Sequence, residues 1–487
     1  MKTFKKIIYI LQSSKRKGAS LLLIMLIILA LLDMIGVASI MPFMAVLTNP
    51  SLVETNNILK TLFEFSGIFG IKTSQDFLFI LGVTVFLLLF ISLLFKAFTT
   101  WFQLRFITMI QHDLGKQLIK GFLNQPYIWF LNRHSADLAK IIFSQINEVN
   151  SKAIKPMFQI ISQTLVTITL VTLLIIVNPK ISLIIFLTFF FTYLILFKVI
   201  KRRLKRIGNE QLISDRMRFE SVTEAFGAIK ELKLSRLENV FIKRFSDPAK
   251  IFAKHTVNAL LLGQLPRYLI EIIAFGGILL ITLYFVSQNN NFATSIPLIS
   301  LYAFAGYRLM PSIQIIYFSV TQLKFAGPSV DVLYHEIKNL KQPLIYQENN
   351  EVVFKNIISL KNIHFHYPYA SKKILKNINL EVKINTTVGI VGATGSGKTT
   401  LVDIILGLLP SQNGVLKIDN NIITNNNVRA WQRQVGYVPQ SIFLTDDTIA
   451  ANIGFGVNAK DIDQNRLVKA SRLANLHEFI TQDLPKK

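Results

Sequence analysis

Six long apolar stretches limit what this chain can fold into. They cover about residues 20–41, 77–95, 157–177, 181–199, 269–286 and 294–318. A helix needs about 20 apolar residues to cross the hydrocarbon core of a bilayer, and each stretch is close to that length. The sequence therefore predicts a transmembrane domain over residues 1–335, with Asn178, Pro179 and Lys180 as a tight turn between the third and fourth helices.

The charge balance is strongly basic, and the apolar content decides how to interpret it. The 487 residues include 53 Lys or Arg and 28 Asp or Glu, a formal net charge of +25, yet 51% of them are hydrophobic. A basic nucleic-acid-binding protein has a much lower apolar fraction, so no nucleic-acid partner is expected. The excess charge instead suits anionic membrane lipids. With no cysteine, a disulfide scaffold, a thiolate metal site and a cysteine nucleophile are excluded.

The distribution of the basic residues predicts how the chain crosses the membrane. Lys and Arg gather before the first stretch and in the long connections 96–156 and 198–264, whereas residues 43–76 carry two and residues 287–293 carry none. Basic loops remain cytoplasmic, so both termini are expected inside the cell. Helical spacing at 136–149 and 214–232 predicts that helices continue into the cytoplasm and turn back near 126–130 and 225–227.

Beyond residue 318 the chain becomes soluble in character. A polar linker is expected over residues 336–353, followed by an incomplete α/β domain over residues 354–487. Strands are predicted at 359–366, 374–382 and 387–391, and a helix at 399–407. Residues 420–427 are rich in Asn and are interpreted as a solvated loop.

Residues 392–399 fit the phosphate-binding pattern G-x-x-x-x-G-K-[ST] between the last predicted strand and the helix. Glycines let backbone N–H groups surround a phosphate, Lys398 reaches the β- and γ-phosphates, and the Thr399 hydroxyl ligates Mg²⁺. The sequence therefore predicts a site for ATP and Mg²⁺; a glycine-rich turn without a ligand is the alternative. The predicted nucleotide contacts in this segment are Gly392, Thr394, Gly395, Ser396, Gly397, Lys398, Thr399 and Thr400.

Residues 408–419, the segment 434–440 and residues 443–453 resemble the nucleotide-binding domain of ABC transporters. This resemblance implies that Gln440 contacts Mg²⁺ and the membrane domain, and that Tyr367 stacks on adenine; a strand-edge tyrosine is the alternative for Tyr367. Six predicted spans before one such domain resemble the half-transporter layout of type IV exporters. The resemblance thus implies a homodimer in which the turns at 125–138 and 226–234 couple the two domains.

The sequence ends at Lys487, before the signature motif, the Walker B strand and the switch histidine of that family. The resemblance then implies an incomplete catalytic set, in which Gln440 is the member present, and a chain deficient in ATP hydrolysis as it stands. Two explanations are open: a fragment of a longer reading frame, or a truncated product that binds nucleotide without hydrolysing it.

Three cations in or beside the apolar stretches are candidates for substrate binding: Arg308, Arg267 and Lys96. A charge at the centre of a span costs about 2.5 to 3.5 kcal/mol on insertion scales, so each of these cations is a candidate functional residue. In the predicted topology all three lie in the cytoplasmic half of the membrane, where they would suit a lipid diphosphate. Each also has a structural alternative: Arg308 can pair with Asp33, Arg267 can pair with Glu271, and Lys96 can reach the interface.

Residues 36–43 and 307–312 resemble bacterial lipid-linked oligosaccharide flippases. This implies ATP-driven flipping or export of a lipid-linked oligosaccharide, or a related anionic lipid, across the bacterial inner membrane. Export of a peptide, another lipid or a drug is an alternative, and so is a non-hydrolytic nucleotide-binding membrane protein. The six apolar stretches exclude a soluble P-loop kinase or GTPase.

Overall fold

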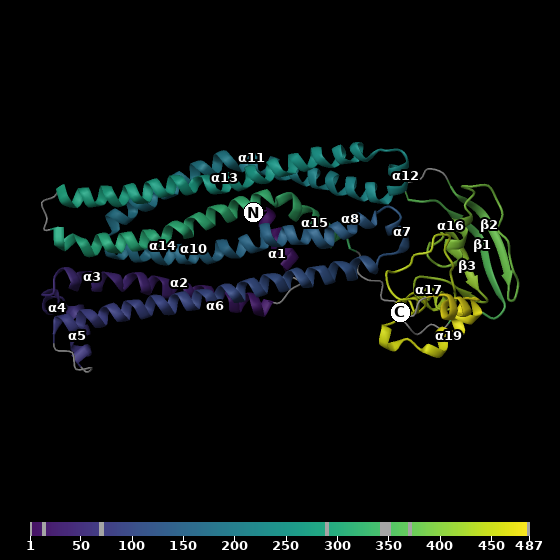
Figure 1. The fold of residues 1–487 in the computed structure, drawn as a ribbon, viewed down its shortest axis with the longest axis horizontal. Coiled ribbons are helices and arrows are strands. Elements are labelled where there is room, and N and C mark those ends of the chain that lie inside the picture. Colours follow the sequence, from purple (N-terminus) through teal and green to yellow (C-terminus); the bar gives the residue numbers. More distant parts are fainter. Residues whose placement is uncertain are drawn as a thin grey trace. The chain divides into compact units, whose positions relative to one another are not determined.

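The computed structural model describes residues 2–11, 16–67, 73–287, 292–340, 352–368 and 373–484 (Figure 1). The chain divides into two compact units, Met1–Leu344 and Ile345–Lys487. In the described residues, the first unit is built from helices and the second from a small sheet with short helices. The predicted fold class, a helical membrane region followed by a smaller α/β domain, is confirmed.

Long helices form the first unit. Its elements are α1 (Lys2–Leu11), α2 (Arg16–Ala38), α3 (Ile40–Thr48), α4 (Leu52–Thr55), α5 (Asn57–Gly67), α6 (Ser74–Leu123), α7 (Tyr127–Phe130), α8 (Ser135–Lys140), α9 (Ile146–Val149), α10 (Lys155–Val177), α11 (Pro179–Gly227), α12 (Ile229–Leu234), α13 (Glu238–Ser287), α14 (Phe292–Phe325) and α15 (Gly327–Asn339). Two π-helical turns, Ile141–Gln145 and Asn150–Ile154, connect α8, α9 and α10 into one continuous helical segment.

Three helical segments of the described residues are long and apolar enough to cross a membrane: Gly18–Thr48, Ser74–Leu123 and Ser135–Val177. They contain the first three predicted spans. The predicted spans 181–199, 269–286 and 294–318 lie within α11, α13 and α14, and their crossing of the membrane stays a prediction.

Local sequence explains where two of the long helices begin. At α6, Thr73 accepts a hydrogen bond from the Asp76 N–H, and its hydroxyl donates to the Asp76 carboxylate at 2.6 Å. At α11, the Asn178 side chain accepts from the Ile181 N–H, and Pro179 occupies the first helical turn, where a missing N–H is harmless. The predicted tight turn between the third and fourth stretches is therefore present.

Packing in the first unit joins helices that are distant in sequence. α11 lies along α13, α2 lies along α6, and α10 packs against both α2 and α14 (Figure 1). One buried cluster unites α1, α6, α9 and α15 through residues such as Ile7, Leu118, Ile146 and Leu333. A second cluster joins α2, α10 and α14. The second cluster places α14 against the first predicted span.

The predicted turns near 126–130 and 225–227 are present, and α15 extends into the predicted linker. Helix α7 occupies residues 127–130, and α11 ends at Gly227. Residues 336–339 of the predicted linker 336–353 form the last turn of α15, and Ile337 packs on the helical core. Residues 341–351 of that linker lie outside the described residues.

The second unit contains an antiparallel four-stranded sheet in the order β2-β1-β3-β4. Its elements are β1 (Ile357–Phe365), β2 (Leu375–Lys383), α16 (Lys398–Ile405), β3 (Asn413–Ile418), β4 (Asn421–Ile422), α17 (Val428–Gln432), α18 (Ile449–Ile453), a 3-10 turn (Ala459–Asp461), α19 (Gln464–Leu473) and a π-helical turn (Phe479–Asp483). The first two predicted strands are confirmed as β1 and β2.

The predicted strand at 387–391 is wrong: these residues have no regular secondary structure and form no ladder with any described strand. A strand exists through its partner's hydrogen bonds, and the apolar pattern cannot supply that partner. The Val391 side chain is consequently 96% exposed. Part of the predicted loop 420–427 also differs, because residues 421 and 422 form β4.

Candidate functional site

The phosphate loop connects the segment 387–391 to α16, and glycine is required at two of its positions. Gly395 has φ +80° and Gly397 has φ +97°, a region that residues with a Cβ rarely adopt. Gly397 is also confined, because a Cβ there would lie 2.9 Å from Cγ2 of Ile374 and 3.0 Å from Cδ2 of Leu375. The loop therefore rests on the start of β2.

Lys398 is the first residue of α16 and folds back over the loop. Its Nζ donates to the carbonyl oxygens of Gly392 at 2.8 Å and Ala393 at 3.0 Å. Three N–H donors on a flexible stem let the ammonium exchange these carbonyls for phosphate oxygens without losing its hydrogen bonds. Positive charge and the amino end of a helix thus meet at one place, which suits an anion.

The remaining predicted contacts occupy the same loop with different exposure. Thr394, Ser396 and Thr399 are exposed and open to a ligand, whereas Thr400 is buried. The Thr400 hydroxyl shares a hydrogen bond of 3.1 Å with the Tyr367 hydroxyl. Tyr367 in turn meets Phe365 edge to face at 5.1 Å between ring centroids. Tyr367 is therefore held beside the phosphate loop, by contacts that sequence spacing did not reveal.

The fit to Mg²⁺ follows from the available donors. In the described parts of the chain, no group of three or more His, Asp or Glu side chains could hold a metal ion. Mg²⁺ keeps several waters and is usually bound through one or two protein oxygens together with substrate phosphates. The exposed Thr399 hydroxyl fits such a site. Gln440 is exposed, and no hydrogen bond among the described residues joins it to the loop.

One carboxyl lies within the helix that follows the loop. Asp403 is buried on α16, one turn beyond Thr399, and burial raises the pKa of its carboxyl. On the sheet, Asp419 accepts hydrogen bonds from the backbone N–H groups of Ile357, Lys355 and Asn356, which lower its pKa. Asp419 thereby fastens the start of β1 to the end of β3.

In the first unit, Arg308 of α14 is paired inside the helical bundle. Its Nη1 lies 3.4 Å from Oδ1 of Asp33 on α2, and the Asp33 side chain is 3% exposed. The same Oδ1 accepts a hydrogen bond of 2.6 Å from the hydroxyl of Ser92 on α6, a fully buried residue. Three helices therefore contribute to one polar cluster. The structure bears out the pairing with Asp33, whereas Ser92 was missed by the sequence reasoning.

The two other candidate cations lie apart from this cluster. Arg267 of α13 donates from Nε to Glu271 at 2.8 Å, so its structural alternative is also borne out. Lys96 lies on α6 one turn beyond Ser92 and is exposed. Among the described residues, no hydrogen bond or ion pair joins Lys96 or Arg267 to the Arg308 cluster.

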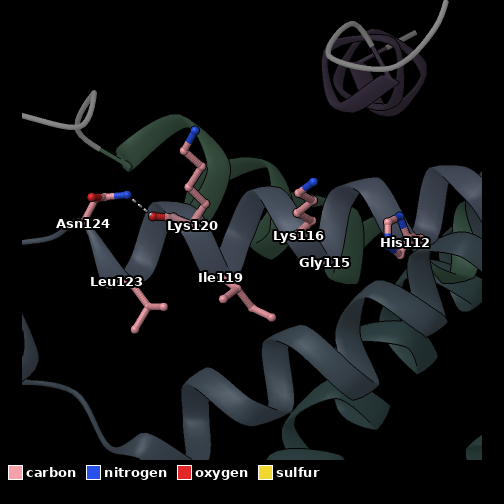
Figure 2. A pocket seen from close by; sticks show the side chains of 7 residues that line it. All are labelled: His112, Gly115, Lys116, Ile119, Lys120, Leu123 and Asn124. Carbon is pink, nitrogen blue, oxygen red and sulfur yellow. Dashed lines mark hydrogen bonds between the residues drawn. The ribbon is translucent and has the colours of Figure 1, made fainter. Parts of the chain in front are cut away.

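A cavity of about 600 Å³ lies farther along α6 and is lined by His112, Gly115, Lys116, Ile119, Lys120, Leu123 and Asn124. Figure 2 shows that Lys116 and Lys120 extend to one side of the helix, and Ile119 and Leu123 to the other. Asn124 donates to the Lys120 carbonyl at 2.7 Å. At a rise of 1.5 Å per residue, His112 is about 30 Å from Ser92. This cavity is therefore separate from the Arg308 cluster.

The turn at α7 is tied to α15, the last described helix of the first unit. Arg133 follows α7, stacks on Trp129 at 4.2 Å from the ring centroid, and donates to Glu336 at 2.8 Å. Tyr127 on α7 is 39% exposed. The ion pair with Glu336 therefore holds the turn in place, and the turn presents an exposed aromatic side chain.

Known protein families match both units. Residues 18–311 match the family described as ABC transporter transmembrane region, and residues 375–486 match the family described as ABC transporter. The first match alone covers more than half of the chain.

One relative matches a short part of this chain at higher identity, and two others match most of it at lower identity. ATP-binding cassette sub-family B member 5 of Mus musculus is 39% identical over 131 residues, 27% of this chain and 10% of that protein. An ATP-dependent lipid A-core flippase of Cupriavidus metallidurans is 23% identical over 370 residues, 75% of this chain and 61% of the flippase. A putative export ATP-binding/permease protein of Rickettsia bellii is 22% identical over 82% of this chain and 70% of its own length. The chain therefore spans less than two thirds of the mouse protein and of the flippase.

Proposed function

This chain belongs to the ABC transporter family, and we propose that it is one half of an ATP-driven exporter that flips an anionic lipid across the membrane. The family match implies ATP binding, usually with Mg²⁺. We further propose that the lipid is a lipid-linked oligosaccharide or a related diphosphate lipid. The membrane would be the bacterial inner membrane, with six spans and both termini in the cytoplasm.

The observation that carries the proposal is a partly buried guanidinium within a helical bundle that the family match assigns to the membrane region. Arg308 of α14 contacts Asp33 of α2, which also accepts a hydrogen bond from Ser92 of α6, and the Arg308 side chain is 17% exposed. An intramembrane cation is costly and marks a substrate or ion pathway by default. A relative that covers most of this chain is named a lipid A-core flippase, which supports a lipid with an anionic head.

In this proposal the second unit binds the nucleotide and the first unit binds the lipid. Lys398 and the backbone of residues 392–399 would bind the phosphates of ATP, Thr399 and Gln440 would ligate Mg²⁺, and Tyr367 would stack on the base. Bound Mg-ATP supplies the free energy for transport through hydrolysis of its terminal phosphate. Arg308 would bind the lipid head group, with Arg267 and Lys96 adding positive charge along its route.

A homodimer is part of this proposal, because half-transporters of the family commonly act as dimers. The turns at α7 and α12 would pass closure of the nucleotide site to the helices. The hydrogen bond from Arg133 to Glu336 holds the turn at α7 against α15, which supports such a role for the first turn.

The test is a flipping assay with the purified full-length protein in proteoliposomes. A fluorescent diphosphate-linked saccharide lipid should move across the bilayer when ATP and Mg²⁺ are added, and Lys398→Ala should abolish this movement while leaving membrane insertion intact. ATP-dependent flipping that persists in Lys398→Ala would contradict the assignment of the site. Movement of a peptide or drug instead would favour another exporter, and nucleotide binding without turnover would favour the non-hydrolytic alternative.

A further inference from the structure

The Arg308 cluster includes the carboxylate of Asp33, and the two contacts to this carboxylate differ in length. The Ser92 hydroxyl holds Asp33 at 2.6 Å, a short hydrogen bond to a carboxylate. Arg308 approaches the same oxygen at 3.4 Å, beyond the usual 2.7 to 2.9 Å of a charge-assisted hydrogen bond. The carboxylate is therefore fixed by Ser92, while Arg308 is attracted to it but loosely held.

Most N–H donors of the Arg308 guanidinium have no hydrogen-bond partner among the described residues. Arginine carries five N–H donors, and the structure gives Arg308 one close contact, to Asp33. No other hydrogen bond or ion pair of its side chain occurs within the described ranges of the chain. The side chain is 17% exposed, so its remaining donors are accessible to an acceptor with several oxygens. Phosphate and diphosphate groups accept such donors in pairs.

Exposed aromatic side chains and an in-helix proline lie close to Arg308 on α14. Phe304, one turn before Arg308 on the same face, is 46% exposed, and the neighbouring Tyr307 is 77% exposed. Pro311 lies inside α14 and removes one backbone hydrogen bond, while the Ser312 hydroxyl donates to the Arg308 carbonyl at 3.0 Å. Apolar aromatic surface beside an unsatisfied guanidinium suits a lipid with a phosphorylated head.

From these contacts we infer that Asp33 is an internal competitor for Arg308, which the diphosphate of the lipid displaces when it binds. Ser92 retains its hydrogen bond to Asp33, so the carboxylate stays paired when Arg308 turns to the ligand. Asp33 and Ser92 are then positioning residues that set the affinity of the site and restrict it to strongly anionic heads. This inference rests on the proposed function, because it assigns a regulator to the same site.

The experiment measures equilibrium binding of radiolabelled farnesyl diphosphate to the full-length protein in phosphatidylcholine nanodiscs. Excess Mg-ADP occupies the phosphate loop, so that the diphosphate does not bind there. Farnesol lacks the charge and inorganic pyrophosphate lacks the chain, so competition by each distinguishes a lipid head group from a free phosphate. The inference predicts that farnesyl diphosphate binds more tightly than either competitor.

Asp33→Asn is the decisive variant, because the amide keeps an acceptor for Ser92 and removes only the competing charge. Its dissociation constant for farnesyl diphosphate should fall at least about fivefold, the lower end of ordinary coupling between sites. Ser92→Ala removes the donor that keeps Asp33 paired when Arg308 turns to the ligand, so it strengthens the competition and should raise the constant; it replaces Asp33→Asn if that variant fails to fold. Arg308→Gln should lose binding.

A matched control is Asp215→Asn, which neutralises a partly buried carboxylate paired with Lys140 at 3.1 Å in the cytoplasmic part of α11. Its dissociation constant should equal that of the unsubstituted protein. If Asp33→Asn and Ser92→Ala also leave the constant unchanged, the competitor role is wrong and the anionic-lipid function is untouched. If the unsubstituted protein binds farnesyl diphosphate no better than farnesol, the anionic-lipid function and the inference both fail.

Discussion

Replacement of Gly397 by Ala tests whether the phosphate loop is built on the start of β2. The residue has φ +97°, where a Cβ costs about 1–2 kcal/mol. The added methyl would also lie 2.9 Å from Cγ2 of Ile374 and 3.0 Å from Cδ2 of Leu375, and such overpacking costs about 1–3 kcal/mol. The two terms sum to about 2–5 kcal/mol of lost stability.

Gly395→Ala is the matched control within the same loop. Its φ of +80° carries a similar backbone cost, but no heavy atom lies within 4 Å of the position of a Cβ. The backbone term therefore cancels in the comparison. Gly397→Ala should be less stable than Gly395→Ala by the overpacking term alone, about 1–3 kcal/mol.

The assay is urea unfolding of the full-length protein, followed by the fluorescence of Trp431. Trp431 is buried and donates to the carbonyl of Ile405 at the end of α16, so its emission reports on the helix that follows the loop. Substituting the two other tryptophans, Trp101 and Trp129, by Phe removes the signal of the first unit. Equal midpoints and slopes for Gly395→Ala and Gly397→Ala would refute the contact with β2 as the reason for glycine.

Three further predictions concern separate contacts. Tyr367→Phe removes the hydroxyl shared with Thr400 but keeps the ring, so the affinity for a fluorescent ATP analogue should fall less than in Tyr367→Ala; equal losses would argue against stacking. The pKa of Asp419 is lowered in the folded protein, so its stabilisation is full above its ordinary pKa of about 3.9 and lost as the pH falls through the lower folded value. Asp419→Asn should remove that part of the acid sensitivity of the urea midpoint, and an unchanged pH profile would exclude this origin. A double-mutant cycle on Arg133→Ala and Glu336→Ala should give a coupling of about 0.5–1 kcal/mol in thermal unfolding, whereas additive effects would show that the pair contributes nothing.

Local signals in the sequence were sufficient for the elements whose stability is local. The turn at Asn178 and Pro179 was predictable because a cap and a fixed φ act within a few residues. The phosphate loop was predictable for a similar reason, since glycines, a lysine and a helix start form one contiguous motif. The strand at 387–391 was not, because an apolar pattern is compatible with a strand but only a pairing partner makes one.

What the sequence determined by itself is the class of the molecule: apolar stretches of bilayer length, basic connections, and a phosphate-binding motif after them. These follow from lengths, charges and spacings that need no knowledge of tertiary contacts. The tertiary structure decided how the cations are used. Asp33, Ser92 and Arg308 are separated by at least 59 residues, and only the packing of α2, α6 and α14 brings them together. Residue type gave Arg308 its charge, but its neighbours determine whether that charge is neutralised, and this depends on which helices lie side by side.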